Sequence, residues 1–140
     1  MILIDAGPLV ALYSPTDSDH ALCASSLSDI HKPLLTTVPV LTQAFHILGP
    51  ATHASDGLRE FVIKGGTDVW HFNTGALVRA FELMEVYTDH PMDLADASLV
   101  TAAESLGITT VFTLDRDFET YRFRRGHRYH AFEILPRRRR

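Results

Sequence analysis

The first five residues, Met-Ile-Leu-Ile-Asp5, constrain the fold more than any other stretch of the chain. A short, unbroken apolar run predicts a strand that is buried on both faces, as in a parallel sheet covered by helices. Asp5 follows the run directly, and Gly7 and Pro8 then predict a turn into a helix. Because ligands of open α/β sheets bind at the carboxyl ends of the strands, we expect the Asp5 carboxylate at the mouth of such a sheet.

Short apolar runs alternate with helical patterns along the rest of the chain. They predict strands at 34–36, 67–71, 109–114 and 129–135, and helices at about 9–13, 18–30, 37–48, 52–64, 74–87 and 93–106. This alternation predicts an α/β fold, a three-layer α/β/α sandwich with a mainly parallel central sheet of four to five strands. The length of 140 residues predicts one domain over 1–140, in which 136–140 form a flexible basic tail.

The composition favours a cytoplasmic protein. No apolar run approaches the roughly 18 residues of a membrane span, so we expect no membrane contact. The N-terminus lacks the basic segment of a signal peptide. The sequence contains a single cysteine, Cys23, which excludes an internal disulfide and fits a reducing cytosol.

Charge is distributed unevenly along the chain. Residues 1–114 contain 13 Asp and Glu against four Lys and Arg, a net charge of −9, whereas residues 115–140 contain four Asp and Glu against nine Arg, a net charge of +5. This asymmetry predicts a cation-binding region beside a region that binds a polyanion.

In the segment 121–129, arginines alternate with aromatic residues, a pattern typical of pairing with RNA phosphates and stacking on unpaired bases. Two alternatives remain open: Tyr129, Phe132 and Ile134 also fit the buried face of an edge strand, and Arg116 also fits a role in offsetting nearby acids. The candidate substrate-binding residues are Arg116, Arg122, Arg124, Arg125 and Arg128.

A second apolar run repeats the pattern of Asp5. Residues 111–114 lead directly into Asp115, and Asp117 follows two residues later. Because parallel strands present their carboxyl ends at one edge, we expect Asp5 and Asp115 to lie near each other, with Asp117 pointing the same way.

The helix predicted at 93–106 brings further acids to the protein's interior. Its apolar stripe continues backwards onto Asp96 and then Asp93. Asp93 fits a helix cap equally well, whereas burial of the Asp96 charge requires a cation or hydrogen-bond donors. Several converging carboxylates without matching basic residues predict either a bound cation or raised pKa values. Oxygen ligands favour Mg²⁺ or Mn²⁺, one or two of which can activate a water against a phosphodiester.

Four ordered motifs resemble those of PIN-domain ribonucleases, and most closely the VapC-like toxins of type II toxin–antitoxin modules. The resemblance covers the whole chain. The motifs are Met-Ile-Leu-Ile-Asp5, Thr36-Thr37-x-Pro39-Val40-Leu41-Thr42-Gln43-Ala44, Asp93-Leu-Ala-Asp96-Ala-Ser-Leu-Val, and Thr113-Leu-Asp115-Arg-Asp117-Phe118.

This resemblance implies a Mg²⁺- or Mn²⁺-dependent endoribonuclease that cleaves RNA with a metal-activated water. It also implies a homodimer and an antitoxin protein that blocks the site. By the same resemblance, Asp5, Asp96 and Asp115 form the metal-binding acidic cluster, Asp93 and Asp117 are secondary metal ligands, and Thr113 supports the cluster through its hydroxyl.

One position departs from the family pattern: Gln43 stands where these proteins usually have Glu. An amide offers a metal an oxygen ligand, but it carries no charge and cannot act as a base. Gln43 remains a catalytic candidate, and the departure supports a second hypothesis of a catalytically weakened RNA-binding or regulatory protein. A third hypothesis, an aspartyl-phosphate phosphohydrolase, expects a second Asp where this chain has Gly7.

Overall fold

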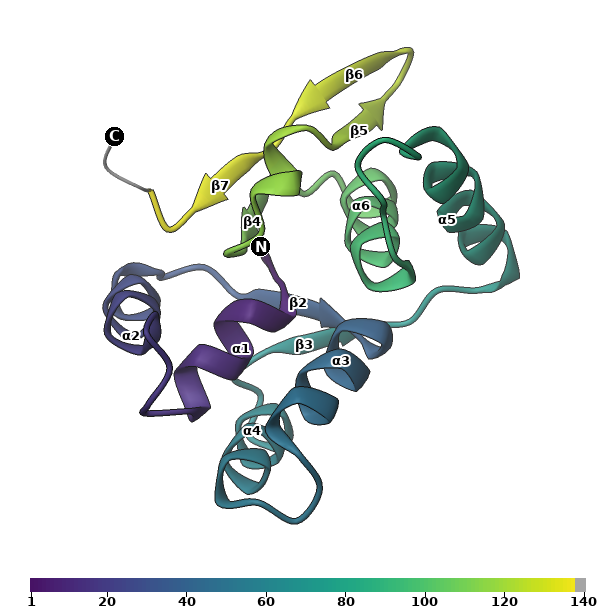
Figure 1. Cartoon of the computed structure of the whole chain (residues 1–140). Coiled ribbons are helices and arrows are strands. Elements are labelled where there is room, and N and C mark those ends of the chain that lie inside the picture. Colours follow the sequence, from purple (N-terminus) through teal and green to yellow (C-terminus); the bar gives the residue numbers. More distant parts are fainter. Residues whose placement is uncertain (138–140) are drawn as a thin grey trace.

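A computed structural model describes residues 1–137 of the protein, which fold around a sheet of five strands (Figure 1). From one edge to the other, the strands are β3 (Asp68–Trp70), β2 (Leu34–Thr37), β1 (Ile2–Ile4), β4 (Thr110–Phe112) and β7 (Glu133–Leu135). Every neighbouring pair in this order is parallel. The predicted α/β fold with a mainly parallel sheet is confirmed, and in this sheet all five strands are parallel.

Six α-helices flank the sheet in the described part of the chain. They are α1 (Ala6–Tyr13), α2 (His20–Asp29), α3 (Val38–Leu48), α4 (His53–Ile63), α5 (Thr74–Val86) and α6 (Leu94–Leu106). Helix α1 packs against α2, α3 and α4, while α5 packs against α6, and α3 contacts α6 (Figure 1). All six predicted helices are present, with boundaries shifted by a few residues. None of the described helices is both long enough and apolar enough to cross a membrane.

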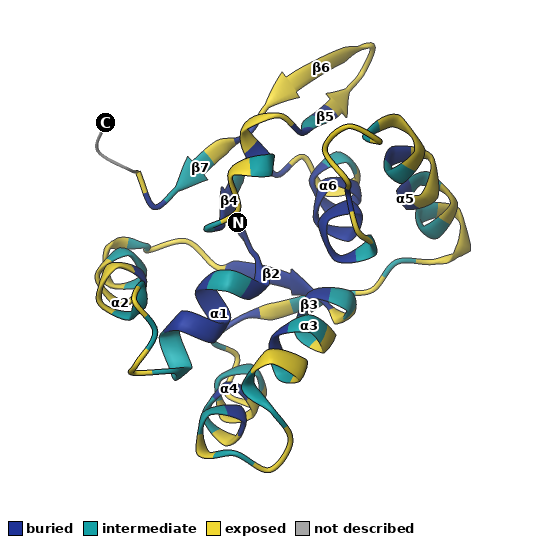
Figure 2. Ribbon diagram, in the orientation of Figure 1, coloured by how far each residue is buried: buried dark blue, intermediate teal, exposed yellow. Residues whose placement is uncertain are grey.

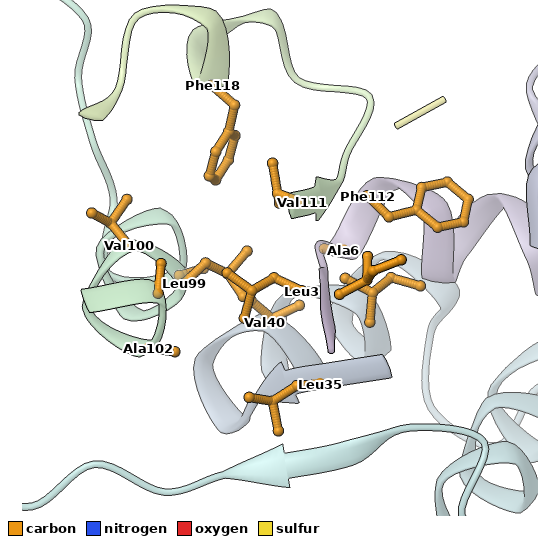
Figure 3. Packing of buried hydrophobic residues seen from close by; sticks show 14 of the residues in the cluster. Leu3, Ala6, Leu35, Val40, Leu99, Val100, Ala102, Val111, Phe112 and Phe118 are labelled. Atoms are coloured by element: carbon orange, nitrogen blue, oxygen red, sulfur yellow. The ribbon is translucent and has the colours of Figure 1, made fainter. Parts of the chain in front are cut away.

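Strand β1 lies in the centre of the core, as its apolar run predicts. All three of its residues are buried, and burial is greatest in the central strands β2, β1 and β4 and on the helix sides that face them, whereas the edge strands β3 and β7 are exposed or half-buried (Figure 2). Leu3 belongs to the same packed cluster as Val40 of α3 and Leu99 of α6 (Figure 3). Each large apolar side chain buried in this way contributes roughly 1.5–3 kcal/mol. This packing holds the end of β1, and with it Asp5, in a fixed position.

The prediction of one edge strand over 129–135 was wrong. Strand β6 (Arg128–Ala131) pairs antiparallel with β5 (Arg122–Arg125) in a hairpin, and only β7 joins the central sheet. Phe132 lies between β6 and β7 and is buried, with its ring centroid 4.8 Å from that of Phe123. The chain therefore leaves the hairpin at the point where this phenyl ring enters the core.

Only part of the predicted basic tail at 136–140 is described. Pro136 is buried, and Nη2 of Arg137 lies 3.3 Å from a carboxylate oxygen of Glu133. Residues 138–140 lie outside the described residues.

Tyr121 fixes the loop that leads into α6. Its side chain is fully buried, and its hydroxyl donates to the carbonyl oxygens of His90 and Pro91 at 3.3 and 3.2 Å. Its ring makes edge contacts with those of Tyr87 and Phe118. Because α6 begins shortly after Pro91, this hydroxyl helps to place the first turn of α6.

We expect Tyr121→Phe to lower the free energy of unfolding by about 1 kcal/mol, because the hydrogen bonds from the Tyr121 hydroxyl to two backbone carbonyl groups are lost. Tyr13→Phe is the matched control. Tyr13 is partly buried against Phe61, and we expect its change to stay within about 0.5 kcal/mol. Urea denaturation measures both variants. A Tyr121→Phe protein as stable as the parent would show that the hydroxyl does not hold the loop.

Candidate active site

The carboxyl ends of the central strands form a row of polar side chains. The pairing of β1 with β2 and β4 places Asp5 level with Thr37 and Thr113. Residues level with one another on neighbouring strands point to the same face of the sheet. Accordingly, Thr113 donates to Asp5, and the hydroxyl oxygens of Thr37 and Ser98 of α6 lie 2.6 Å apart. The row therefore faces α6.

Asp5 is a buried carboxylate with two hydrogen bonds. Its Oδ1 accepts the backbone N–H of Ala6 at 2.8 Å, which caps α1, and its Oδ2 accepts the hydroxyl of Thr113 at 2.7 Å. Burial raises the pKa of Asp5 to about 6, although both hydrogen bonds act to lower it. The negative charges of Asp115 and Asp93 raise this pKa further.

Asp93 and Asp96 form a capping box at the start of α6. Oδ1 of Asp93 accepts the N–H of Asp96 at 2.8 Å, and Oδ2 of Asp96 accepts the N–H of Asp93 at 3.3 Å. Asp93 therefore caps α6, which is one of the two roles that the sequence left open for it, and Asp96 lies on the buried face with 7% of its surface exposed. Burial raises the pKa of Asp96 to about 8, and the charges of Asp93, Asp5 and Asp115 add to this effect. Four carboxylates from three segments therefore interact electrostatically.

Gln43 is hydrogen-bonded to this cluster from α3. Its Nε2 donates to Oδ2 of Asp93 at 2.7 Å. Because a carboxylate oxygen can only accept when it is ionised, the amide must present its N–H₂ group to Asp93. A glutamate at this position could not make the same bond to an ionised Asp93. The local sequence does not reveal this contact, which joins residues 50 positions apart.

Asp115 and Asp117 lie at the more exposed side of the site. The N–H of Asp115 donates to the Thr113 hydroxyl at 3.0 Å, and Oδ1 of Asp115 accepts the N–H of Asp117 at 2.9 Å. This second bond caps the 3₁₀ turn at Arg116–Glu119. Oδ1 of Asp117 lies 3.6 Å from Nδ1 of His90. The charge of Asp115 acts on the pKa values of Asp5 and Asp96, whereas Asp117 contacts His90.

The chemistry of these donors fits a hard divalent cation. The site offers carboxylate and amide oxygens, and within residues 1–137 neither Asp5 nor Asp96 forms an ion pair with Lys or Arg. In the same residues, no group of three or more His, Cys, Asp or Glu side chains is arranged to hold a metal directly. Asp93 instead faces Gln43, and Asp115 faces a backbone N–H. Shared coordination of a cation therefore requires rotation of these side chains.

The arginine-rich segment is only partly exposed. Nη1 of Arg122 donates to the carbonyl oxygens of Glu119 and Tyr121, so this guanidinium is held against the backbone. Tyr121 and Phe123 are buried, so the prediction that these aromatic residues stack on bases was wrong, whereas Tyr129 is 60% exposed. The four exposed arginines among the predicted substrate-binding residues are Arg116, Arg124, Arg125 and Arg128.

Comparison with solved structures finds the same fold. The VapC20 toxin of Mycobacterium tuberculosis, which cleaves the sarcin–ricin loop, has a TM-score of 0.78 and 17% sequence identity, over 86% of this chain and 94% of that one. The structure of VapBC2 from Rickettsia felis, bound to a DNA fragment from its promoter, has a TM-score of 0.62 and 11% sequence identity, over 96% of this chain and 97% of that one. At sequence identities this low, the comparison establishes a shared fold and no more.

Comparison with curated proteins by sequence found no match. The family model of the PIN domain, however, matches residues 2–124. This match contains both strand-end acids, Asp5 and Asp115, and the capping box at the start of α6. The resemblance inferred from the four motifs is thereby confirmed, and the chain belongs to the PIN-domain family.

Proposed function

We propose that the protein is a metal-dependent endoribonuclease that cleaves RNA phosphodiester bonds and acts as the toxin of a toxin–antitoxin pair. The pair of buried carboxylates, Asp5 and Asp96, carries this proposal. Burial of two neighbouring negative charges opposes folding unless a cation binds or the groups take up protons. The two acids lie at the carboxyl edge of a parallel sheet, where ligands of such folds bind. A site for a cation and a phosphate group accounts for both features.

In this proposal, each acid has a defined part. Thr113 orients Asp5 through its hydroxyl, and the start of α6 orients Asp96 through the backbone N–H of Asp93 in the capping box. When bound, the cation would supply a nucleophilic hydroxide and stabilise negative charge on the phosphate. Asp5, Asp96 and Asp115 would hold Mg²⁺ or Mn²⁺, with Asp93, Asp117 and the oxygen of Gln43 assisting.

The exposed arginines of the β5–β6 hairpin would bind the RNA. Arg125 stands opposite Arg128 in the hairpin register, so the two guanidinium groups share one face. The sarcin–ricin loop cleavage by VapC20 supports RNA as the substrate class. The VapBC2 assembly supports an antitoxin protein as a partner. By resemblance to the family, the protein would act in the cytoplasm as a homodimer.

One observation favours the weaker alternative, an RNA-binding or regulatory protein with little activity. Gln43 donates to Asp93, so it adds no negative charge for a cation and already occupies one hydrogen-bonding position of Asp93. The two functions differ in turnover, and the experiments below separate them.

We expect the metal-free protein to lose stability as the pH rises from about 4 to about 8. The pKa values of Asp5 and Asp96 are raised from 3.8 to about 6 and about 8, so in this range the folded state binds more protons than the unfolded state. The stability that these two acids contribute by binding protons is complete below pH 3.8, and it is lost as the pH rises through their pKa values in the folded state. Urea denaturation in EDTA measures the profile, and Mg²⁺ should restore stability at pH 8. A flat or rising profile would contradict this.

Asp96→Asn should remove activity and stabilise the metal-free protein at pH 8. We expect cutting of RNA to fall by about 100-fold or more, because even outer-shell changes at metal sites lower activity 10- to 100-fold. The neutral amide also removes a buried charge, so the pH profile in EDTA should flatten. Asp29→Asn, at the exposed end of α2, is the matched control. Metal-dependent cutting by Asp96→Asn at the parent rate would refute this role.

Gln43→Glu should lower stability in EDTA and raise the affinity for Mg²⁺. The substitution replaces an exposed hydrogen bond to Asp93 by two facing carboxylates, so we expect a loss of about 0.5–1.5 kcal/mol at pH 8. Gln43→Ala separates loss of the bond from the added charge. Titration calorimetry measures Mg²⁺ binding. Cleavage of a mixed RNA pool in EDTA, Mg²⁺ and Mn²⁺ then tests the function, because cutting by the variant alone would favour the weakened alternative.

A further inference from the structure

A hollow of about 530 Å³ lies beside α6 and is not part of the acidic cluster. We name it the Trp70 pocket. Its volume lies within the range of small-ligand sites in proteins, roughly 300–1,000 Å³. The residues that matter most among those lining it are Trp70, His71, Arg79, Glu104, Ser105 and Arg124.

The strand register connects this pocket to the acids. Trp70 pairs with Thr37, and Thr37 stands level with Asp5, so all three belong to one row at the carboxyl edge of the sheet. The row points toward α6, and Trp70 accordingly lines the pocket together with α6 residues. Since neighbouring strands lie about 4.8 Å apart, the backbone of Trp70 is about 10 Å from that of Asp5. A strand of RNA held at the acids can therefore reach the indole.

The charges in the pocket do not repel a polyanion. Glu104 accepts from Nε and Nη2 of Arg79 at 2.8 and 3.1 Å, and it also accepts the backbone N–H of Arg124 at 2.6 Å. Nη1 of Arg79 lies 3.2 Å from a carboxylate oxygen of Glu82. Glu104 thus forms an ion pair with Arg79, which Arg79 shares with Glu82, and the exposed Arg124, which also lines the pocket beside the exposed His71, adds a second positive charge.

The indole also borders a smaller apolar hollow. This hollow, of about 330 Å³, is lined by Val38, Pro39, Trp70, His71 and Phe72. The rings of Trp70 and Phe72 meet edge to face, with centroids 6.0 Å apart. An aromatic side chain with open space on more than one side can stack on a base, because every nucleobase has an apolar face.

We propose that the Trp70 pocket binds an unpaired nucleotide of the RNA substrate, flanking the phosphate at the acidic cluster. The base stacks on Trp70, and Arg124 and His71 contact the adjoining phosphates. This inference rests on the proposed function for the identity of the substrate, but it concerns binding and not the chemical step. The arrangement gives the enzyme a contact with unpaired bases beside the cut, which a paired helix cannot make.

Trp70 is the only tryptophan in the chain, so its fluorescence reports directly on the pocket. The full-length protein is titrated in EDTA with a short single-stranded RNA of mixed sequence, and with the same RNA annealed to its complement. We expect the single strand to quench the indole and the duplex to leave it unchanged. Tight binding of the single strand with unchanged fluorescence would overturn the proposal.

Variants test the same contact by an independent readout. The affinity for fluorophore-labelled single-stranded RNA should fall about 5- to 150-fold in Trp70→Ala, the range observed for loss of one stacked base. Trp70→Phe retains an aromatic face and should recover much of this loss, which separates stacking from misfolding. Arg124→Ala should also weaken binding. Phe81→Ala, an exposed aromatic residue on α5, and Arg59→Ala on α4 are the matched controls.

The outcomes distinguish this inference from the proposed function. Quenching by RNA that the parent never cuts, in Mg²⁺ or in Mn²⁺, would support the pocket and refute the nuclease. Metal-dependent cutting with equal RNA affinity in the parent, Trp70→Ala and the controls would support the nuclease and refute the pocket.

Discussion

The burial of two carboxylates at the end of the central strand is the constraint on which the site depends. Asp5 and Asp96 are 5% and 7% exposed, and the packing of β1, α3 and α6 keeps them there. Hydrogen bonds from Ala6, Thr113 and Asp93 offset part of the unfavourable burial, but burial still raises both pKa values. The apolar core thus supplies the free energy that holds these two acids in a buried position that disfavours their charged forms.

The parallel register organises the rest of the edge around these acids. Because all five strands run in one direction, their carboxyl ends meet at one edge, and residues level with one another share a face. Thr113, Asp5, Thr37 and Trp70 form such a row across four neighbouring strands. The hydroxyl of Thr113 orients Asp5, and that of Thr37 connects β2 to α6 through Ser98. The indole of Trp70 stands at the end of the row, beside the Trp70 pocket. The geometry that gathers the acids also places the aromatic side chain.

The sequence predicts those parts of the structure that local patterns determine. The run into Asp5 and the helix periods depend on neighbours within a few residues, and both are confirmed; the cap at Asp93, which the sequence left open beside another role, is equally local and is present. The sequence does not predict the β5–β6 hairpin, because β6 and β7 are separated only by Phe132, whose buried side chain marks a break that no local pattern shows. Tyr121 and Phe123 alternate with arginines as base-stacking residues do, yet distant aromatic rings bury them. No local pattern contains the bond between Gln43 and Asp93, which depends on how α3 meets α6.

That bond determines how the departure from the family pattern acts. Asp93 has two carboxylate oxygens: Oδ1 caps α6 through the N–H of Asp96, and Oδ2 accepts from Gln43. Both oxygens therefore serve the metal-free fold, and each accepts one hydrogen bond and retains a further lone pair. A glutamate at position 43 would withdraw its donor, add a charge and release Asp93 toward the cluster. The glutamine therefore stabilises the start of α6 through this hydrogen bond, and it adds no negative charge to the four carboxylates nearby.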